Sequence, residues 1–136
     1  MASRLNPYIT FRSNAREAMG FYRDVLGGDL AISTFADFGG SSEGVDPDGV
    51  MHARLDTPLG FTLMASDAAL HDVSEESCIT ISISGDDAVA LRGYFEGLMA
   101  GGTVQVPLST QSWGDEFGMG TDRFGVSWMV NITPGA

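Results

Sequence analysis

The sequence contains no lysine and a single cysteine, and its acidic residues far outnumber its basic ones. The 18 Asp and Glu residues face seven arginines, which gives a formal net charge of −11. Such a charge repels phosphate backbones and anionic lipids, so we expect neither nucleic acid nor membranes as partners. Because Cys78 is alone, no disulfide can form within the chain, and a reducing compartment is indicated.

Long apolar runs are also missing. No stretch of about 18 apolar residues occurs, which excludes a transmembrane helix. The N-terminus lacks a basic segment followed by an apolar one, so no secretory signal is visible, and we expect a cytoplasmic protein. At 136 residues and 43% apolar residues, the chain is long enough for one domain, or two tightly fused half-domains, with a buried core.

A strand–helix pattern occurs twice, about 73 residues apart. The first copy is a strand at Asn6–Phe11, a helix at Ala15–Leu26 and the pair Gly27-Gly28. The second is a strand at Cys78–Ser84, a helix at Asp87–Ala100 and the pair Gly101-Gly102. We therefore predict two copies of one strand–helix–strands module, spanning residues 1–68 and 69–136.

Local signals support both helices. Asn14 is a favourable N-cap, and Glu17 completes the spacing of a capping box. In the second copy, Gly85-Asp86-Asp87 places acids where the helix dipole favours them. Each helix has an apolar stripe. The stripes are Ala15, Ala18, Met19, Tyr22, Val25 and Leu26 in the first helix, and Ala88, Leu91, Phe95, Leu98 and Met99 in the second.

Alternating patterns predict the remaining strands. They are Asp29–Phe38, Val50–Asp56, Gly60–Ser66, Thr103–Leu108 and Val126–Ile132, with a further hairpin arm beginning near Trp113 and Phe117. The Gly- and acid-rich stretch Gly39–Gly49 is either a solvated connection or a lid over a pocket. Asp67–Glu76 reads as an acidic linker, in which His71 is expected to be solvated.

One face of the first sheet is predicted to be unusually mixed. If the apolar side chains of the strands contact the helix, the opposite face carries a different set. That set is Tyr8, Thr10, His52, Arg54, Thr62 and Met64. It is too polar for a dry core and too apolar for a plain solvent face, and it resembles the wall of a ligand-binding cup.

The arrangement resembles the vicinal oxygen chelate superfamily, which includes glyoxalase I, extradiol dioxygenases and bleomycin-resistance proteins, and most of all its PhnB-like, 3-demethylubiquinone 3-methyltransferase-like branch. The residues that carry the resemblance span nearly the whole chain. They are Asn6-Pro7-Tyr8, Glu17-Ala18-Met19, Phe21-Tyr22, Gly27-Gly28, Met51-His52-Ala53, Gly60 to Asp67, Gly101 to Val104, Trp113-Gly114, Phe117-Gly118-Met119, Asp122, Phe124-Gly125-Val126 and Trp128-Met129. The resemblance implies an α+β fold of two βαβββ modules, whose curved mixed sheets form a cup.

In metal-dependent members of that superfamily, four His or Glu side chains bind one divalent ion. The corresponding positions here fall near Asn6, Met64, Cys78 and Met129. An amide, a thiol and two thioethers are poor ligands for Mg, Mn, Ni or Fe(II). We therefore expect no metal and no other cofactor. A G-x-G nucleotide loop is also missing after the first strand, which argues against a methyl-donor site.

Several residues on the predicted cup have two readings. His52, beside Tyr8, is either a general base or anion partner, or a histidine that fills a polar wall. Arg54 binds an anion or pairs with Asp56. Cys78 is either a nucleophile or inert packing, and we include its position among the ligand contacts.

Aromatic and methionine side chains form the rest of the predicted site. Trp113, Phe117, Phe124 and Trp128 are candidates for contacting a flat ligand; Trp128 is expected in the core, and Trp113 and Phe117 at the rim. Met64, Met119 and Met129 would form an adaptable wall.

Two functions remain open. The first is a binding module that sequesters a small, partly aromatic or anionic molecule without metal. The alternative is an enzyme of the glyoxalase, lyase or dioxygenase kind, metal-free or dependent on a divalent metal, in which His52 and Tyr8 transfer a proton. The resemblance also implies a homodimer.

Overall fold

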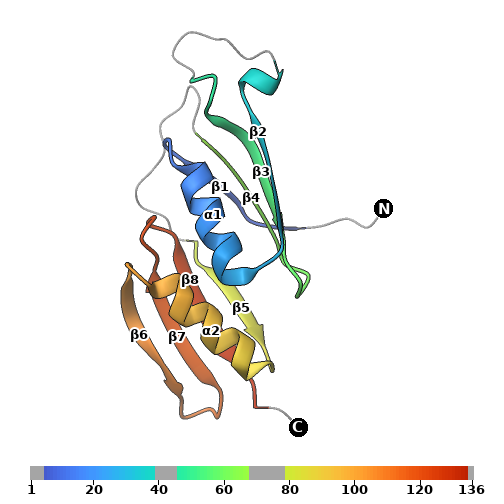
Figure 1. Ribbon diagram of the computed structural model, residues 1–136. Helices are drawn as coiled ribbons and strands as arrows, with labels where there is room; N and C mark the ends of the chain where they lie inside the picture. Colours follow the sequence, from blue (N-terminus) through green and yellow to red (C-terminus); the bar gives the residue numbers. More distant parts are fainter. Residues whose placement is uncertain (1–4, 39–45, 68–78, 135–136) are drawn as a thin grey trace. The chain divides into compact units, whose positions relative to one another are not determined.

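The computed structural model describes residues 5–38, 46–67 and 79–134 of the chain. The chain divides into two compact units, Met1–Ser74 and Glu75–Ala136, which are described separately below. The division falls between residues 74 and 75, within a stretch, residues 68–78, that lies outside the described residues. Figure 1 shows the strands and helices of both units.

Both units have the same succession of elements. The first contains β1 (Tyr8–Phe11), α1 (Ala15–Leu26), β2 (Asp29–Thr34), the short 3-10 helix η1 (Ala36–Phe38), β3 (Val50–Asp56) and β4 (Thr62–Asp67). The second contains β5 (Ile81–Gly85), α2 (Ala88–Met99), β6 (Thr103–Thr110), β7 (Glu116–Thr121) and β8 (Ser127–Ile132). The predicted bounds of α1 and β3 are reproduced, and those of α2 shorten by one residue at each end.

The strand order is also the same in both units. The sheets run β1-β4-β3-β2 and β5-β8-β7-β6, and in each the first strand pairs in parallel with the last while the other pairs are antiparallel. The predicted α+β fold of two βαβββ modules is therefore confirmed. Each sheet is open-edged within its unit.

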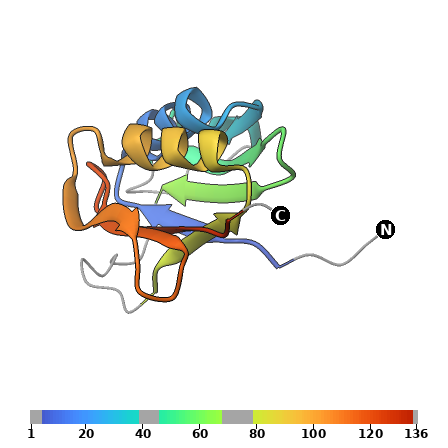
Figure 2. The ribbon, with the colours of Figure 1, turned by 90° about the horizontal axis from the view of Figure 1, so that it is seen from below.

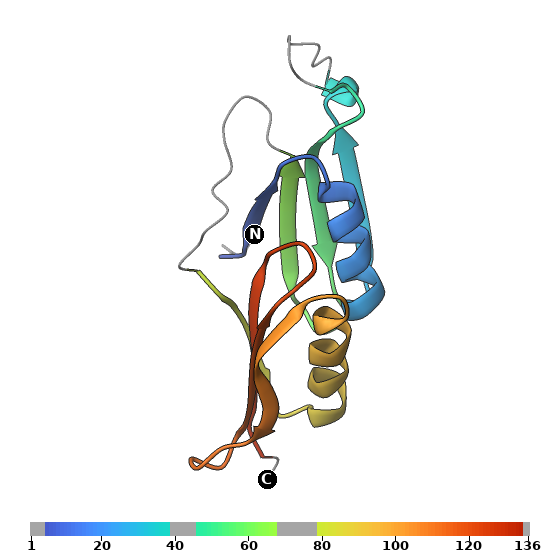
Figure 3. The ribbon, with the colours of Figure 1, turned by 90° about the vertical axis from the view of Figure 1, so that its left-hand side faces the viewer.

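One face of each sheet is covered by the helix of the same unit. Helix α1 packs on β2, β3 and β4 (Figure 3), and its buried residues are Ala15, Ala18, Met19, Tyr22 and Leu26. Helix α2, which lies across its own sheet in Figure 2, packs on all four strands of the second unit. Trp128 is 1% exposed in this second core, as predicted. Burial of each large side chain contributes roughly 1.5–3 kcal/mol, which selects this face.

The double glycines Gly27-Gly28 and Gly101-Gly102 have the same structural role in the two units. A Cβ on Gly28 would overlap the carbonyl oxygen of Asp56, and a Cβ on Gly102 would overlap that of Thr121. Both oxygens lie beside the turn of the last hairpin of their unit. Only glycine lets the chain leaving the helix approach that turn so closely. The double glycine that repeats in the sequence thus makes the same close backbone contact in each unit.

Four local expectations were wrong. The second strand ends at Thr34, because Asp37 turns the chain: its Oδ2 accepts the Thr34 N–H at 2.9 Å, and its own N–H donates to Thr34 Oγ1 at 3.2 Å. Asp67 is no linker residue but the last residue of β4, 9% exposed. Asn14 makes no side-chain cap on α1. The fifth strand begins only at Ile81, and Cys78 lies outside the described residues.

Candidate functional site

The sheet of the first unit has one face that no described element of that unit covers. We call it the open face: Tyr8, Thr10, His52, Arg54, Thr62 and Met64. The neighbouring residues on each strand, such as Ala53, Leu55, Leu63 and Ala65, are buried on the α1 side. Because strand side chains alternate, the predicted polar set lies on the other side, where all but exposed Tyr8 are half-buried.

The open face brings Tyr8 and His52 together. Tyr8 is in register with Met64 on β4, and His52 is on β3, the next strand along. The Tyr8 hydroxyl lies 3.4 Å from Nδ1 of His52, and the ring centroids are 5.8 Å apart. When the imidazole carries its proton on Nε2, the hydroxyl donates to Nδ1. Nε2 of His52 then remains the nitrogen that a ligand would meet.

Arg54 forms the pair with Asp56 that was one of its two predicted readings. Its Nε donates to Asp56 Oδ2 at 2.9 Å, and the hydroxyl of Thr62 donates to Asp56 Oδ1 at 3.0 Å. The side chains of Arg54 and Asp56 are 39% and 48% exposed. Asp56 therefore orients both Arg54 and Thr62 on the open face.

Thr10 and Met64 complete the open face. Thr10 is in register with Ser66, and Met64 lies between Tyr8 and Arg54, with which it pairs on either side. A flexible thioether at this central place adapts to the shape of a ligand. The six predicted residues thus form one continuous surface across β1, β4 and β3.

Of the residues predicted in the second unit, Phe117, Met119 and Met129 lie on the corresponding face of its own sheet. Phe117 and Met129 alternate with buried Gly118 and Val130, and Met119 is in register with Met129. Trp113 is 62% exposed and contacts Phe117 edge-on, with ring centroids 6.3 Å apart. These side chains form an apolar, sulfur-rich surface with an aromatic end.

No group of three or more His, Cys, Asp or Glu that could hold an ion occurs in residues 5–38, 46–67 and 79–134. Asn6, Met64 and Met129 offer an amide and two thioethers, which hard divalent ions disfavour. Met64 is in register with Tyr8, and Met129 is in register with Ser82. If Met64 and Met129 are equivalent positions, the second-unit counterpart of Asn6 is Thr80, which precedes Ser82 by two residues as Asn6 precedes Tyr8.

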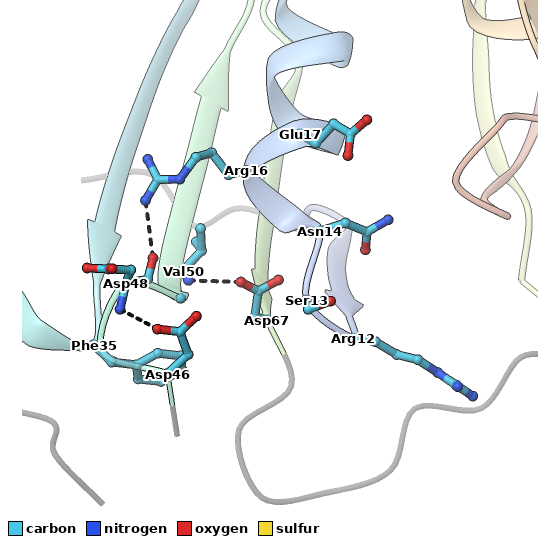
Figure 4. A pocket seen from close by; sticks show the side chains of 11 residues that line it. Arg12, Ser13, Asn14, Arg16, Glu17, Phe35, Asp46, Asp48, Val50 and Asp67 are labelled. Carbon is cyan, nitrogen blue, oxygen red and sulfur yellow. Dashed lines mark hydrogen bonds between the residues drawn. The ribbon is translucent and has the colours of Figure 1, made fainter. Parts of the chain in front are cut away.

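A cavity of about 510 Å³ lies at the start of α1, and sequence reasoning missed it (Figure 4). Its lining shares no residue with the open face. It consists of Arg12, Ser13, Asn14, Arg16, Glu17, Phe35, Asp46, Asp48, Gly49, Val50 and Asp67. The signal that could have found it is the clustering of Arg12 and Arg16 around the predicted N-cap.

Two carboxylates that line this cavity, Asp67 and Asp46, bind backbone N–H groups. Asp67 Oδ1 accepts the Ala15 N–H at 2.8 Å, and Oδ2 accepts the Val50 N–H at 2.9 Å. Asp46 Oδ1 accepts the Asp48 N–H at 2.9 Å, and Arg16 reaches the Asp48 carbonyl (Figure 4). The cavity therefore lies over a structural joint between α1, β3 and β4.

The resolved pKa shifts lie elsewhere. The guanidinium of Arg92, on α2, lowers the pKa of Glu116 through a hydrogen bond of 3.1 Å from Nε to Oε1, and Glu116 raises the pKa of Arg92 in return. Hydrogen bonds from Thr34 lower the pKa of Asp37.

Within the described residues, no helix has the length and apolar character to cross a bilayer.

Known proteins resemble the chain along almost its whole length. A model of the family described as 3-demethylubiquinone-9 3-methyltransferase matches residues 3–131. Protein YjdN of Escherichia coli (strain K12) is 28% identical over 139 residues, covering 94% of this chain and 94% of YjdN.

Solved structures also resemble the chain along almost its whole length. The crystal structure of protein PA1353 from Pseudomonas aeruginosa is 40% identical, with a TM-score of 0.83, over 98% of this chain and 100% of that one. The glyoxylase/bleomycin resistance protein/dioxygenase domain from Frankia sp. EAN1pec, at 13% identity, shares the fold with a TM-score of 0.67, over 100% and 95% of the two chains. The chain thus belongs to the 3-demethylubiquinone-9 3-methyltransferase family, with the fold of the glyoxalase/bleomycin resistance/dioxygenase proteins.

Proposed function

We propose that this protein binds a small, partly aromatic or anionic molecule on the open face, without the metal used by its enzymatic relatives. The contact between Tyr8 and His52 carries the proposal. It places an aromatic ring, a hydroxyl and an imidazole side by side on a surface where Met64 adds a soft apolar contact. A ligand with a flat ring and one polar substituent matches these groups.

The open face is a better candidate than the cavity at the start of α1. Asp67 in that cavity already accepts two backbone N–H groups, so a ligand would compete with the fold for it. On the open face, the residues that a ligand would contact are side chains of a rigid sheet, which keeps their geometry fixed. The cavity is therefore assigned to structure and the open face to binding.

A second function, proton transfer, is favoured by the same pair. If the proton of a neutral His52 lies on Nδ1 and is donated to the Tyr8 oxygen, Nε2 keeps a free lone pair and can take a proton from a bound phenol or from the carbon beside a bound carbonyl. Methyl transfer has no comparable support, because the β1–α1 connection, Arg12-Ser13-Asn14, contains no glycine to cradle a methyl-donor nucleotide.

The test compares the wild-type protein with His52→Ala. We expect the variant to keep its melting temperature within about 2 °C, because a half-buried surface position contributes little to stability. Its affinity for acetophenone, an uncharged aromatic carbonyl compound, should fall about tenfold. The affinity is measured by titrating acetophenone into the protein and recording protein NMR spectra. Unchanged affinity in the variant would exclude this site. Metal analysis of the purified protein, showing stoichiometric divalent metal, would instead favour a metal-dependent enzyme.

Proton transfer is tested with the same ligand. In deuterium oxide, an active His52 accelerates exchange of the acetophenone methyl protons, and His52→Ala loses this acceleration. Binding without exchange leaves the protein as a binder.

We further propose that the protein is a cytoplasmic homodimer. The proposed location rests on the single cysteine, and dimerisation on the large apolar side chains that are exposed, including Ile79 at 71% and Val89 at 84%. Sedimentation at micromolar concentration distinguishes dimer from monomer. The net charge of −11 opposes nucleic acid as a partner.

A further inference from the structure

We propose that Asp56 sets the charge preference of the open face, so that it selects an uncharged oxygen acceptor over an anion. Asp56 is then a specificity-determining residue, although it need not contact the ligand. The inference rests on the proposed function, because it concerns a ligand bound beside Tyr8 and His52. It decides between the two ligand classes, partly aromatic and anionic, that the proposed function leaves open.

The first step is the way in which Asp56 holds Arg54. Both carboxylate oxygens of Asp56 are used, one by Arg54 Nε at 2.9 Å and the other by the Thr62 hydroxyl at 3.0 Å. The contact engages only Nε of the guanidinium. Arg54 has no other hydrogen-bond partner in the described part of the chain, so its two terminal nitrogens keep their donors for a ligand.

The second step is the position of Arg54 relative to the ligand. Arg54 is in register with Met64 on β4, and Met64 is in register with Tyr8 on β1. Arg54 also follows His52 by two residues on β3, which places it on the same face about 7 Å along the strand. A ring that contacts Tyr8, His52 and Met64 therefore brings its polar substituent within reach of Arg54.

The third step is the local charge. Asp29 on β2 is in register with Asp56, so a second carboxylate lies on the strand next to this corner. The other residues in register with Arg54 are Ala31 and Met64, which are uncharged. Asp56 and Asp29 bring two formal negative charges to this corner, and Arg54 brings one positive charge. A carboxylate at the terminal nitrogens of Arg54 is therefore repelled by Asp56 and Asp29, whereas a carbonyl or phenol oxygen accepts a hydrogen bond there without that repulsion.

The experiment uses two probes of nearly equal shape, acetophenone and benzoate, which differ in charge. Dissociation constants are measured for the wild-type protein, Asp56→Asn and the control Asp24→Asn. The control removes one carboxylate from an exposed ion pair, Arg23–Asp24, on α1, which covers the other face of the sheet. Each variant therefore changes the total charge equally. Titrations at low and high salt test whether any change is electrostatic.

We expect wild type to prefer acetophenone. In Asp56→Asn, the dissociation constant for benzoate should fall about tenfold, the size expected for one partly screened charge, while that for acetophenone changes less than about twofold. The gain should shrink at high salt, and Asp24→Asn should leave both constants unchanged. Arg54→Met keeps an apolar side chain of similar length but removes the guanidinium, and it should weaken acetophenone binding. This variant keeps the test decisive if Asp56→Asn does not fold.

The failures of the two proposals are distinguishable. If His52→Ala weakens binding but Asp56→Asn leaves the benzoate-to-acetophenone ratio unchanged, or changes it no more than Asp24→Asn does, Asp56 has no selective role and the binding site stands. If neither probe binds wild type at millimolar concentration, or His52→Ala binds both normally, the open face is not the site, and the role of Asp56 is overturned with it.

Discussion

The hydroxyl of Tyr8 and Nδ1 of His52 lie 3.4 Å apart although 44 positions separate the two residues in the sequence. The parallel pairing of β1 with β4 and the antiparallel pairing of β4 with β3 produce this contact. The hydrogen bond orients the imidazole on a sheet face that no described element of its own unit covers. The predictions below test this pair and the contacts that support its sheet.

The first prediction concerns Tyr8. Tyr8→Phe should weaken acetophenone binding about three- to tenfold, because it removes one hydrogen bond worth about 0.5–1.5 kcal/mol and keeps the ring. Its melting temperature should hardly change, since Tyr8 is 52% exposed. A double-mutant cycle with His52→Ala should show that the two effects are not additive. Additive losses would mean that Tyr8 and His52 act independently on the ligand.

The second prediction concerns Asp67. Asp67→Ala should lower the free energy of unfolding by about 2–4 kcal/mol, because the Ala15 and Val50 N–H groups both lose a charged, buried acceptor. Asn14→Ala is the matched control. It should cost less than about 0.5 kcal/mol, because Asn14 forms no side-chain cap. Urea denaturation measures the free energy of unfolding of both variants. A larger loss for Asn14→Ala than for Asp67→Ala would mean that Asn14, and not Asp67, caps α1.

The third prediction concerns the double glycine of the second unit. Gly102→Ala should destabilise by about 2–4 kcal/mol, since the new Cβ would overlap Thr121 O and lie 2.9 Å from Asp122 Cα. Gly93→Ala, within α2, adds the same methyl group with nothing within 4 Å. It should stabilise by about 0.5–1 kcal/mol through helix propensity. Thermal unfolding of the two variants should therefore shift in opposite directions.

The fourth prediction concerns pH. The Arg92 hydrogen bond lowers the pKa of Glu116 in the folded protein, so this ion pair contributes stability above the unfolded pKa, and the contribution disappears as pH falls through the folded pKa. Wild type should be more stable than Glu116→Gln at pH 7. The difference should vanish as pH drops below the ordinary value of 4.5. A difference that stays constant from pH 7 to pH 3 would contradict the role of this carboxylate.

Local sequence signals predicted much of the fold. The apolar stripe gave the bounds of α1, and alternation gave β3 and placed His52 and Arg54 opposite Ala53 and Leu55. These features depend on neighbours within a few positions, where periodicity determines which face is buried. The end of α1 followed from Gly27, which has a positive φ of 77°. Turns were less accurate: Asp37 ended β2 early through hydrogen bonds to Thr34 that the alternation pattern does not contain.

Contacts between distant segments were not predictable. Asn14 is a favourable helix-cap residue, but the Ala15 N–H is instead accepted by Asp67, 52 positions from Ala15, because β4 ends beneath the start of α1. The cavity beside Asp67 was missed for the same reason. Of the predicted site, the membership of the open face came from alternation, but the contact of Tyr8 with His52 came from the strand order.

By itself, the sequence determined the two repeated modules, the burial of each helix and the residue types of the open face, because each depends on a periodic pattern along the chain. Only the tertiary structure decided which of those residues meet. Strand order and register set the distances between Tyr8 and His52, between Arg54 and its neighbour Met64, and between Asp67 and the start of α1. The physical reason is that chain closure between distant segments is governed by the packing of the whole unit, and no short window of sequence contains it.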